Sequence, residues 1–163
     1  MLTDPSPAGA IPFPPDGPDR AYTVVGGSAE GPLVGGNLSL LAATVGTPYA
    51  VDARGAILFL EEVGEPAYRI DRLLSQLRLS GALEGVAGIA VGAISDSPEV
   101  PGDHPEPAEL LLDRLGELGV PVAFGFPFGH VPDNWTLPMG VRARLDADAG
   151  TLEILDAAVE RPS

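Results

Sequence analysis

Two kinds of ionisable side chain, carboxylate and imidazole, follow apolar runs of this sequence and could together catalyse a proton transfer. Glu61 and Glu62 come directly after the apolar run 56–60, and His130 ends the segment F-P-F-G-H, which follows the apolar run 120–124. In open α/β sheets, functional groups gather just past the carboxyl ends of the strands. A carboxylate that holds one imidazole nitrogen fixes the tautomer, and the other nitrogen can then accept a proton from a nucleophile. The spacing therefore suggests an acid–histidine pair as the candidate catalytic group.

Simpler interpretations of the polar residues stay open at this point. A carboxylate at a strand end is usually solvated, and a single histidine near aromatic residues is usually structural. We interpret His104, in P-G-D-H-P-E-P, as a solvated loop residue. Trp135 can equally line a substrate pocket or pack in the core. Three arginines of one expected helix can bind a substrate carboxylate, although such residues more often solvate the helix surface: Arg69, Arg72 and Arg78.

The composition rules out several kinds of site. The 163 residues include 23 acids, nine arginines and two histidines, with no cysteine and no lysine. Disulfide scaffolds, cysteine-ligated zinc, multi-histidine metal sites, cysteine nucleophiles and Schiff-base lysines are therefore excluded. The net charge of −14 argues against nucleic acid and against anionic membrane surfaces as partners.

Neither a transmembrane segment nor a signal peptide is expected from the hydropathy pattern. No apolar run approaches the roughly 18 residues of a membrane-spanning helix. The first residues lack a basic region and are interrupted by prolines, unlike a secretory signal. We therefore expect a cytoplasmic location. The glycine-rich region 26–37 lacks both the G-x-G-x-x-G spacing and a lysine, so turns and packing between domains are favoured over phosphate binding.

The order of apolar runs predicts one α/β domain over residues 22–163, preceded by a proline-rich tail or linker over residues 1–21. Proline at nearly every third position disfavours helices and sheet ladders in that tail. Turn residues D-A-D-A-G between two alternating segments predict a C-terminal β-hairpin. We expect strands at 22–25, 56–60, 86–94, 120–124, 141–145 and 151–155, helices at 38–45 (capped by Asn37), from Pro66 to before Gly81 and at 108–118, and loops at 26–36, 95–107 and 126–138.

Four motifs in this order resemble the C-terminal half of the LD-carboxypeptidases, a family of serine peptidases. The resemblance extends from about Tyr22 to Val159. The motifs are G-P-L-V-G-G-N-L-S-L-L at 31–41 with G-T-P-Y at 46–49, I-L-F-L-E-E-V-G-E-P-A-Y-R-I-D-R-L-L-S-Q-L at 57–77, P-V-A-F-G-F-P-F-G-H at 121–130 and L-P-M-G-V-R-A-R-L-D at 137–146.

The resemblance implies a specific chemistry. The family uses a Ser–Glu–His triad, without metal or cofactor, to remove the terminal D-alanine from murein tetrapeptides during cell-wall recycling in the cytoplasm. Its triad glutamate corresponds to Glu61 and its triad histidine to His130, while Glu62 stands where relatives often carry an aspartate. The implied fold is a compact swivelling β/β/α-type domain. Some relatives instead cleave peptidyl-nucleotide antibiotics of the microcin C type, for which Trp135 is the candidate nucleobase contact.

One feature of the family pattern has no counterpart in this sequence. In the family the nucleophilic serine lies in an N-terminal domain, and none of the eight serines here stands in a G-x-S-x-G context. Ser39 and Ser75 fall inside expected helices, where a hydroxyl usually packs or competes for a cap. We therefore expect a C-terminal domain that is inactive alone, with an N-terminal domain in cis or in trans and a murein tetrapeptide as partners.

Two further expectations concern the partners of this domain. A domain that normally contacts another should expose apolar side chains around its G-G-N and F-P-F-G-H segments. A homodimer is also compatible with the family resemblance. A non-catalytic binding module that keeps the fold is the alternative function, and a microcin-type peptidase is the alternative substrate class.

Overall fold

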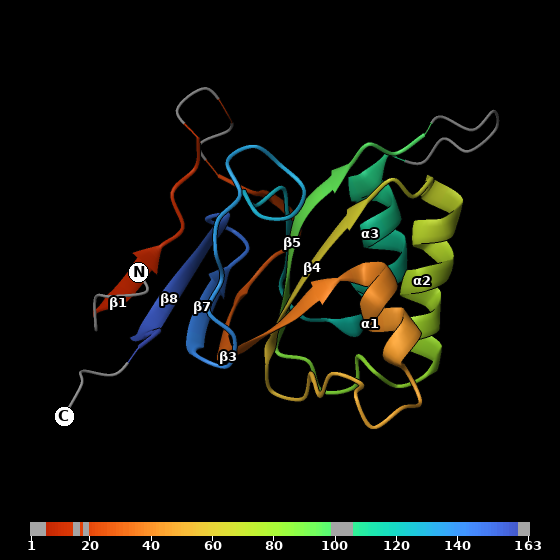
Figure 1. Ribbon diagram of the computed structural model, residues 1–163, viewed down its shortest axis with the longest axis horizontal. Helices are drawn as coiled ribbons and strands as arrows, with labels where there is room; N and C mark the ends of the chain where they lie inside the picture. Colours follow the sequence, from red (N-terminus) through yellow and green to blue (C-terminus); the bar gives the residue numbers. More distant parts are fainter. Residues whose placement is uncertain (1–5, 15–16, 18–19, 99–105, 160–163) are drawn as a thin grey trace.

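The computed structural model describes residues 6–14, 17, 20–98 and 106–159, which form a mixed sheet with helices along one face (Figure 1). The sheet order is β1-β8-β7-β3-β4-β5-β6-β2. The strands are β1 (Pro7–Ala10), β2 (Tyr22–Val25), β3 (Ser28–Asn37), β4 (Ile57–Val63), β5 (Gly88–Ser95), β6 (Val122–Phe124), β7 (Arg142–Asp146) and β8 (Thr151–Ala157). The helices are α1 (Leu38–Thr44), α2 (Ala67–Leu79) and α3 (Pro107–Leu115), which continues into the 3₁₀-helix η1 (Gly116–Leu118). The predicted α/β class and the C-terminal hairpin, β7–β8, are confirmed.

Strand β3 joins the two halves of the sheet. Its first half, Ser28–Pro32, pairs antiparallel with β7, and its second half, Leu33–Asn37, pairs parallel with β4. The prediction of a loop over residues 26–36 is therefore wrong from Ser28 onward. The parallel strands β3, β4 and β5 carry the helices, whereas β1, β8 and β7 form the antiparallel half (Figure 1).

The glycines of β3 serve close packing rather than a turn. A Cβ added at Gly31 would lie 2.2 Å from the Gly55 carbonyl oxygen, and one added at Gly35 would lie 1.9 Å from the Phe59 carbonyl oxygen. Side chains at these positions would push β3 away from the chain beside it. Composition alone cannot distinguish this use of glycine from loop formation, because both produce a glycine-rich segment.

The N-terminal segment is part of the sheet, so the prediction that residues 1–21 form a tail is wrong for the residues around β1. Strand β1 pairs antiparallel with β8, and the Ile11 N–H donates to the Leu152 carbonyl at 2.9 Å. Ile11 is buried, and the ring of Phe13 lies 6.1 Å from that of Phe126. An edge strand that begins with proline tolerates the missing N–H, because that side of the ladder needs no donor.

The helices form one layer over the parallel strands, and α1 and α2 begin where their sequence signals predict. The Asn37 side chain caps α1 by accepting from the Leu40 N–H at 3.1 Å. Helix α2 follows Pro66 and buries Ile70, Leu74 and Leu77 against the sheet. Tyr68, expected in the same apolar stripe, is instead 43% exposed. The buried stripe of α2 is therefore narrower than predicted.

Side chains of β4 alternate between two cores on opposite faces of the sheet. Leu58 and Leu60 pack beneath the helices. Ile57 and Phe59 pack in the other core, which includes Phe126 and is covered by the segment 125–141. This alternation decides the side on which each following residue of β4 lies.

Candidate active site

The two candidate acids lie inside β4, not after it, because the strand continues to Val63. By the alternation of the strand, Glu61 faces the segment 125–141 and Glu62 faces the helices. Both are buried, with Glu61 9% and Glu62 2% exposed. Buried carboxylates are stable in a strand only when hydrogen-bonded, and such partners are not visible in a hydropathy pattern. The predicted strand 56–60 was therefore too short.

A β-bulge beside Glu61 creates the docking point for the histidine segment. Leu60 of β4 pairs with Val91 of β5, but Glu62 pairs with Ile94, so β5 has one residue more than β4 across this step. The bulge frees the N–H of Ala93, which donates to the Phe128 carbonyl at 2.9 Å. Bulges commonly redirect the chain next to active sites. Here the bulge receives the F-P-F-G-H segment.

Aromatic rings hold that segment against the sheet. The rings of Phe126 and Phe128 are stacked with centroids 6.0 Å apart, and Phe128 meets Phe59 of β4 edge-on at 5.8 Å. The Gly129 N–H donates to the Asn134 side-chain oxygen at 3.1 Å. Such packing fixes the backbone immediately before His130 and leaves few alternative positions for its ring.

The structure brings Glu61 and His130 into direct contact. The His130 Nδ1 lies 2.8 Å from Glu61 Oε2. An ionised carboxylate only accepts, so Nδ1 carries the proton of this bond and Nε2 is the nitrogen that can accept another. The Glu61 side chain is 10% exposed and that of His130 is 58% exposed, so the acid lies beneath a ring that a reactant can reach. The expected pair is present, and its catalytic role stays a prediction.

Gly129 is the residue that allows this contact, and Gly129→Ala tests it. Its φ is +112°, and an added Cβ would lie 2.9 Å from both Glu61 Cβ and Glu61 Oε2. We expect the substitution to displace the carboxylate. If the chain is assayed together with the serine-bearing N-terminal domain that the family resemblance implies, kcat should fall about 100-fold, because misplacement by about 1 Å has that effect. Steady-state kinetics check this. Gly140→Ala is the matched control, since φ is +79° there and no atom lies within 4 Å of the added Cβ. Equal kinetics of both variants would contradict the steric role of Gly129.

Glu62 has a structural partnership that the sequence did not reveal. Its carboxylate accepts four hydrogen bonds, from Asn37 Nδ2 (3.0 Å), Ser39 N (2.8 Å), Ser39 Oγ (2.7 Å) and Val63 N (2.9 Å). The hydroxyl of Ser39 is therefore committed to Glu62. The signal that could have indicated this role is the pair of adjacent acids, because neighbouring strand residues face opposite sides of a sheet.

Trp135 and the arginines of α2 contact groups other than Glu61 and His130. Trp135 is half-buried in the second core and also lines a hollow of about 420 Å³ beside residues 12–14, so both interpretations of it stand. The three arginines of α2 contact their own surroundings, as the solvation interpretation predicts: Arg69 pairs with Glu65, Arg72 lies 5.4 Å from the Tyr68 ring, and Arg78 pairs with Glu117. His104 lies outside the described residues.

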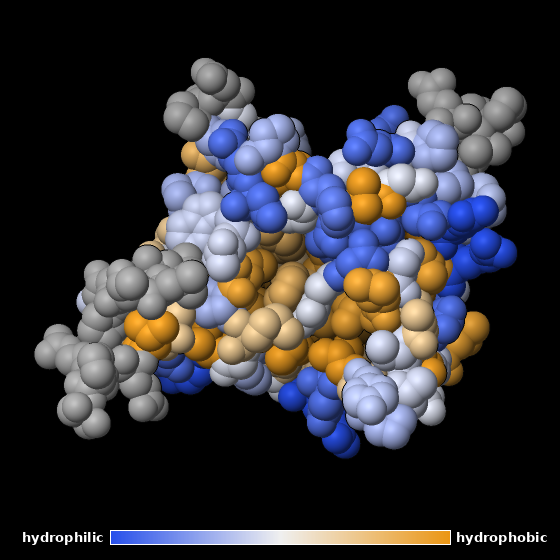
Figure 2. Space-filling model, in the orientation of Figure 1, coloured by the Kyte–Doolittle hydropathy of each residue, from blue (hydrophilic) through white to orange (hydrophobic). Residues whose placement is uncertain are grey.

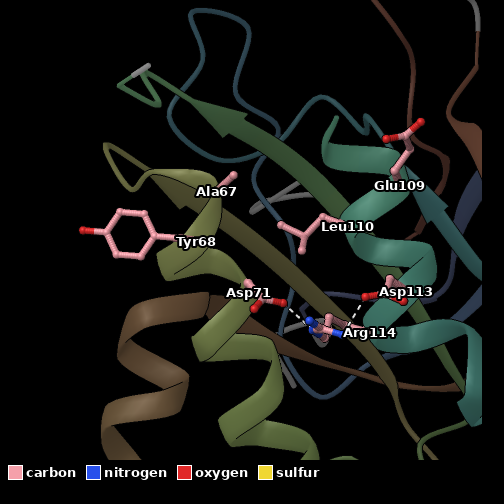
Figure 3. A pocket seen from close by; sticks show the side chains of 7 residues that line it. All are labelled: Ala67, Tyr68, Asp71, Glu109, Leu110, Asp113 and Arg114. Carbon is pink, nitrogen blue, oxygen red and sulfur yellow. Dashed lines mark hydrogen bonds and ion pairs between the residues drawn. The ribbon is translucent and has the colours of Figure 1, made fainter. Parts of the chain in front are cut away.

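A second hollow, of about 400 Å³, lies between α2 and α3 (Figure 3). Arg114 points into it from α3 and pairs with both Asp71 and Asp113. The pKa of Arg114 is raised above its ordinary value, chiefly by the hydrogen bond to Asp71. Because the Arg114 guanidinium is already paired with two carboxylates and the hollow lies in the helix layer, it is not the candidate active site.

Across residues 6–14, 17, 20–98 and 106–159, no group of three or more acidic or histidine side chains is arranged to hold a metal ion. None of the helices in this part of the chain is long and apolar enough to cross a membrane.

Residues 30–145 match the model of a family described as the LD-carboxypeptidase C-terminal domain, and the chain belongs to this family. The match includes Glu61, the bulge on β5 and His130. The family resemblance read from the sequence is thereby confirmed, and it places the chain among carboxypeptidase domains, a class of hydrolases.

Individual relatives agree with this assignment. A Streptomyces coelicolor protein with a provisional carboxypeptidase name is 52% identical over 132 residues, which cover 80% of this chain and 41% of that protein. A muramoyltetrapeptide carboxypeptidase from Oxalobacter formigenes is similar in structure, with a TM-score of 0.73 and 39% identity over 83% of this chain and 49% of that one. The microcin C7 self-immunity protein in complex with aspartyl sulfamoyl adenosine has a TM-score of 0.75 and 29% identity, covering 86% of this chain and 42% of that one. The chain thus spans about half or less of these relatives.

Proposed function

We propose that this chain supplies the histidine and the glutamate of a Ser–Glu–His triad in an LD-carboxypeptidase that removes terminal D-alanine from murein tetrapeptides. The observation that carries the proposal is the 2.8 Å contact between His130 Nδ1 and the buried Glu61 carboxylate. The relation to the muramoyltetrapeptide carboxypeptidase supports the substrate class. Recycling of murein peptides takes place inside the cell, so a cytoplasmic location is part of the proposal.

The geometry assigns a defined task to each of the two side chains. His130 Nε2 takes the proton of a serine hydroxyl as its oxygen attacks the amide carbonyl, while Glu61 holds Nδ1–H and stabilises the imidazolium. The C–N bond then breaks, the imidazolium gives its proton to the amine of the departing D-alanine, and an acyl-serine remains. His130 next takes a proton from water, whose oxygen attacks the ester carbonyl. The ester C–O bond then breaks, the imidazolium gives that proton to the departing serine oxygen, and the shortened peptide leaves as a carboxylic acid.

The serine in this scheme belongs to a domain outside these 163 residues. A serine-to-alanine change is among the substitutions in an active-site mutant of the microcin C7 self-immunity protein, which supports a serine nucleophile in this fold. Ser39, the serine next to the acids of β4, is held by Glu62 and faces the helix side. Removal of a triad nucleophile lowers turnover by roughly a million-fold, so the chain alone is expected to be inactive.

We place the docking surface for the serine-bearing domain on the face shown in Figure 2. Apolar side chains gather in a hollowed centre of this face, over β3, β4 and the beginning of α1. Leu40, beside the G-G-N segment, is 68% exposed, and Met139, at the end of the loop that carries His130, is 58% exposed. An exposed apolar area of this kind is typical of an interaction surface. Leu40 supports the part of the expectation that concerns the G-G-N segment, whereas the rings of the F-P-F-G-H segment, Phe126 and Phe128, are each only 2% exposed.

Release of D-alanine from a murein tetrapeptide tests the proposed function. We expect no release by the chain alone and measurable release when it is mixed with, or fused to, the serine-bearing N-terminal domain of a relative. We call this combination the reconstituted enzyme. The His130→Ala variant in the same mixture is the control. Release by the chain alone that depends on His130 would overturn the assignment of the nucleophile. An associated but inactive mixture would favour a non-catalytic binding module instead.

A second substrate class is favoured by one comparison, the similarity to the self-immunity protein bound to aspartyl sulfamoyl adenosine. An active-site lysine is among the residues replaced in a mutant of that protein, whereas this chain contains no lysine. We therefore rank the murein peptide first. Hydrolysis of an aminoacyl sulfamoyl adenosine by the reconstituted enzyme, at a higher kcat/KM than the tetrapeptide, would reverse that order.

A further inference from the structure

The backbone of Glu61 lies where both of its ladders are weak. Its pairing with Asn37 is the last pair between β3 and β4, and beyond it the chain of β3 turns into α1. On the other side, the ladder between β4 and β5 is interrupted at Glu61 by the bulge. A strand position between a ladder end and a bulge is held by few backbone hydrogen bonds. Some other contact must therefore keep the Glu61 side chain on His130.

The neighbouring residue supplies that contact. Glu62 is 2% exposed, and its four donors come from three places: the end of β3 (Asn37), the first turn of α1 (Ser39) and the next residue of β4 (Val63). Both carboxylate oxygens accept two bonds each. The carboxylate thus ties β4 to β3 and α1 one residue beyond the last ladder pair, on the face opposite to Glu61 and His130.

We propose that Glu62 is the positioning residue of the Glu61–His130 pair, and we name Glu62 with Asn37 and Ser39 the acid clamp. This inference rests on the proposed function for its catalytic consequence. The acid clamp fixes the backbone at Glu61, and Gly129 and the bulge fix the opposite partner. Glu62 touches neither the imidazole nor a reacting atom, so its effect passes entirely through Glu61.

Glu62→Gln tests the acid clamp with almost no change of shape. Each oxygen position receives at least one backbone N–H, from Ser39 or from Val63. The amide nitrogen of glutamine is itself a donor, so in either orientation a buried N–H loses its acceptor. We expect the end of β4 to shift in Glu62→Gln. Because Glu62→Asp keeps the carboxylate, we expect it to retain most of the wild-type NMR signal and kcat. Glu109→Gln, an exposed acid of α3, is the matched control.

The first readout is the proton NMR spectrum of the 163-residue chain. A ring N–H that donates to a carboxylate resonates far downfield, and with only two histidines in the chain His130→Ala assigns the signal. We expect the His130 signal to broaden or disappear in Glu62→Gln, while the cooperative unfolding transition persists. An unchanged signal in folded Glu62→Gln would overturn the proposal.

The second readout is kinetic and uses the reconstituted enzyme. We expect kcat to fall about 100-fold in Glu62→Gln with KM nearly unchanged, because the geometry of proton transfer changes and the substrate contacts do not. A rise in KM at constant kcat would overturn the proposal. If Glu62→Gln does not fold, Ser39→Ala removes one bond of the acid clamp, and its unaltered kcat and NMR signal would also overturn it.

The two readouts separate the proposals. If the NMR signal responds to Glu62→Gln but the wild-type mixture shows no hydrolysis, the proposed function fails and the positioning role of Glu62 stands. If the mixture hydrolyses the tetrapeptide and Glu62→Gln changes neither the signal nor kcat, the proposed function stands and the positioning role fails.

Discussion

His130→Ala is expected to lower kcat for D-alanine release by about 10⁴–10⁶-fold in the reconstituted enzyme. The imidazole is the group that accepts the serine proton and returns it to the leaving amine, and alanine can do neither. The ring is more than half exposed, so its loss leaves no buried cavity, but the buried Glu61 carboxylate loses its hydrogen-bond partner. We therefore expect the variant to fold with a lower unfolding midpoint than the wild type. A D-alanine assay, with thermal unfolding followed in parallel, measures both properties.

Glu61→Gln is also expected to lower kcat for D-alanine release. Glutamine keeps the shape but cannot act as an anionic acceptor, and the corresponding amide substitution in a serine protease triad lowers kcat about 10⁴-fold. The two variants should not be additive, because both disable one proton-transfer unit. A double variant whose loss equals the product of the single losses would show that Glu61 and His130 act independently, contrary to the 2.8 Å contact.

Gly92→Ala is expected to lower both the stability and the activity. A Cβ at Gly92 would lie 2.4 Å from both the ring and the carbonyl oxygen of Phe128. The backbone of the F-P-F-G-H segment must therefore move off the bulge, which gives up the bond between Ala93 N and the Phe128 carbonyl. Overpacking of a core costs about 1–3 kcal/mol, and the lost hydrogen bond adds about 1 kcal/mol. Urea unfolding should show a lower midpoint, and kcat should fall with it.

Gly116→Ala is the matched control for that substitution. Gly116 has helical φ and ψ of −59° and −36°, and the nearest atom to an added Cβ is the flexible end of Leu112 at 3.2 Å. Alanine at a compatible position usually adds about 0.4–1 kcal/mol of stability by restricting the unfolded chain. A Gly92→Ala variant as stable as Gly116→Ala would contradict the docking of Phe128 on the bulge.

Local signals in the sequence were sufficient for the elements that depend on neighbouring residues. The cap of α1 by Asn37, the start of α2 after Pro66 and the turn of the β7–β8 hairpin follow from residues a few positions apart. Two segments were misjudged because their composition resembles loops. The glycines of β3 and the prolines around β1 belong to strands whose partners are distant in the sequence.

The sequence by itself determined the α/β class, the family and the identity of the two candidate side chains, because the motifs that carry them are short and continuous. Only the tertiary structure decided how those side chains meet. Glu61 and His130 are 69 residues apart, and their contact depends on a bulge on β5, a glycine against the carboxylate and an adjacent buried acid. These features arise from pairings between strands. Such pairings involve residues far apart in the chain, and a hydropathy pattern records only the residue's own burial preference.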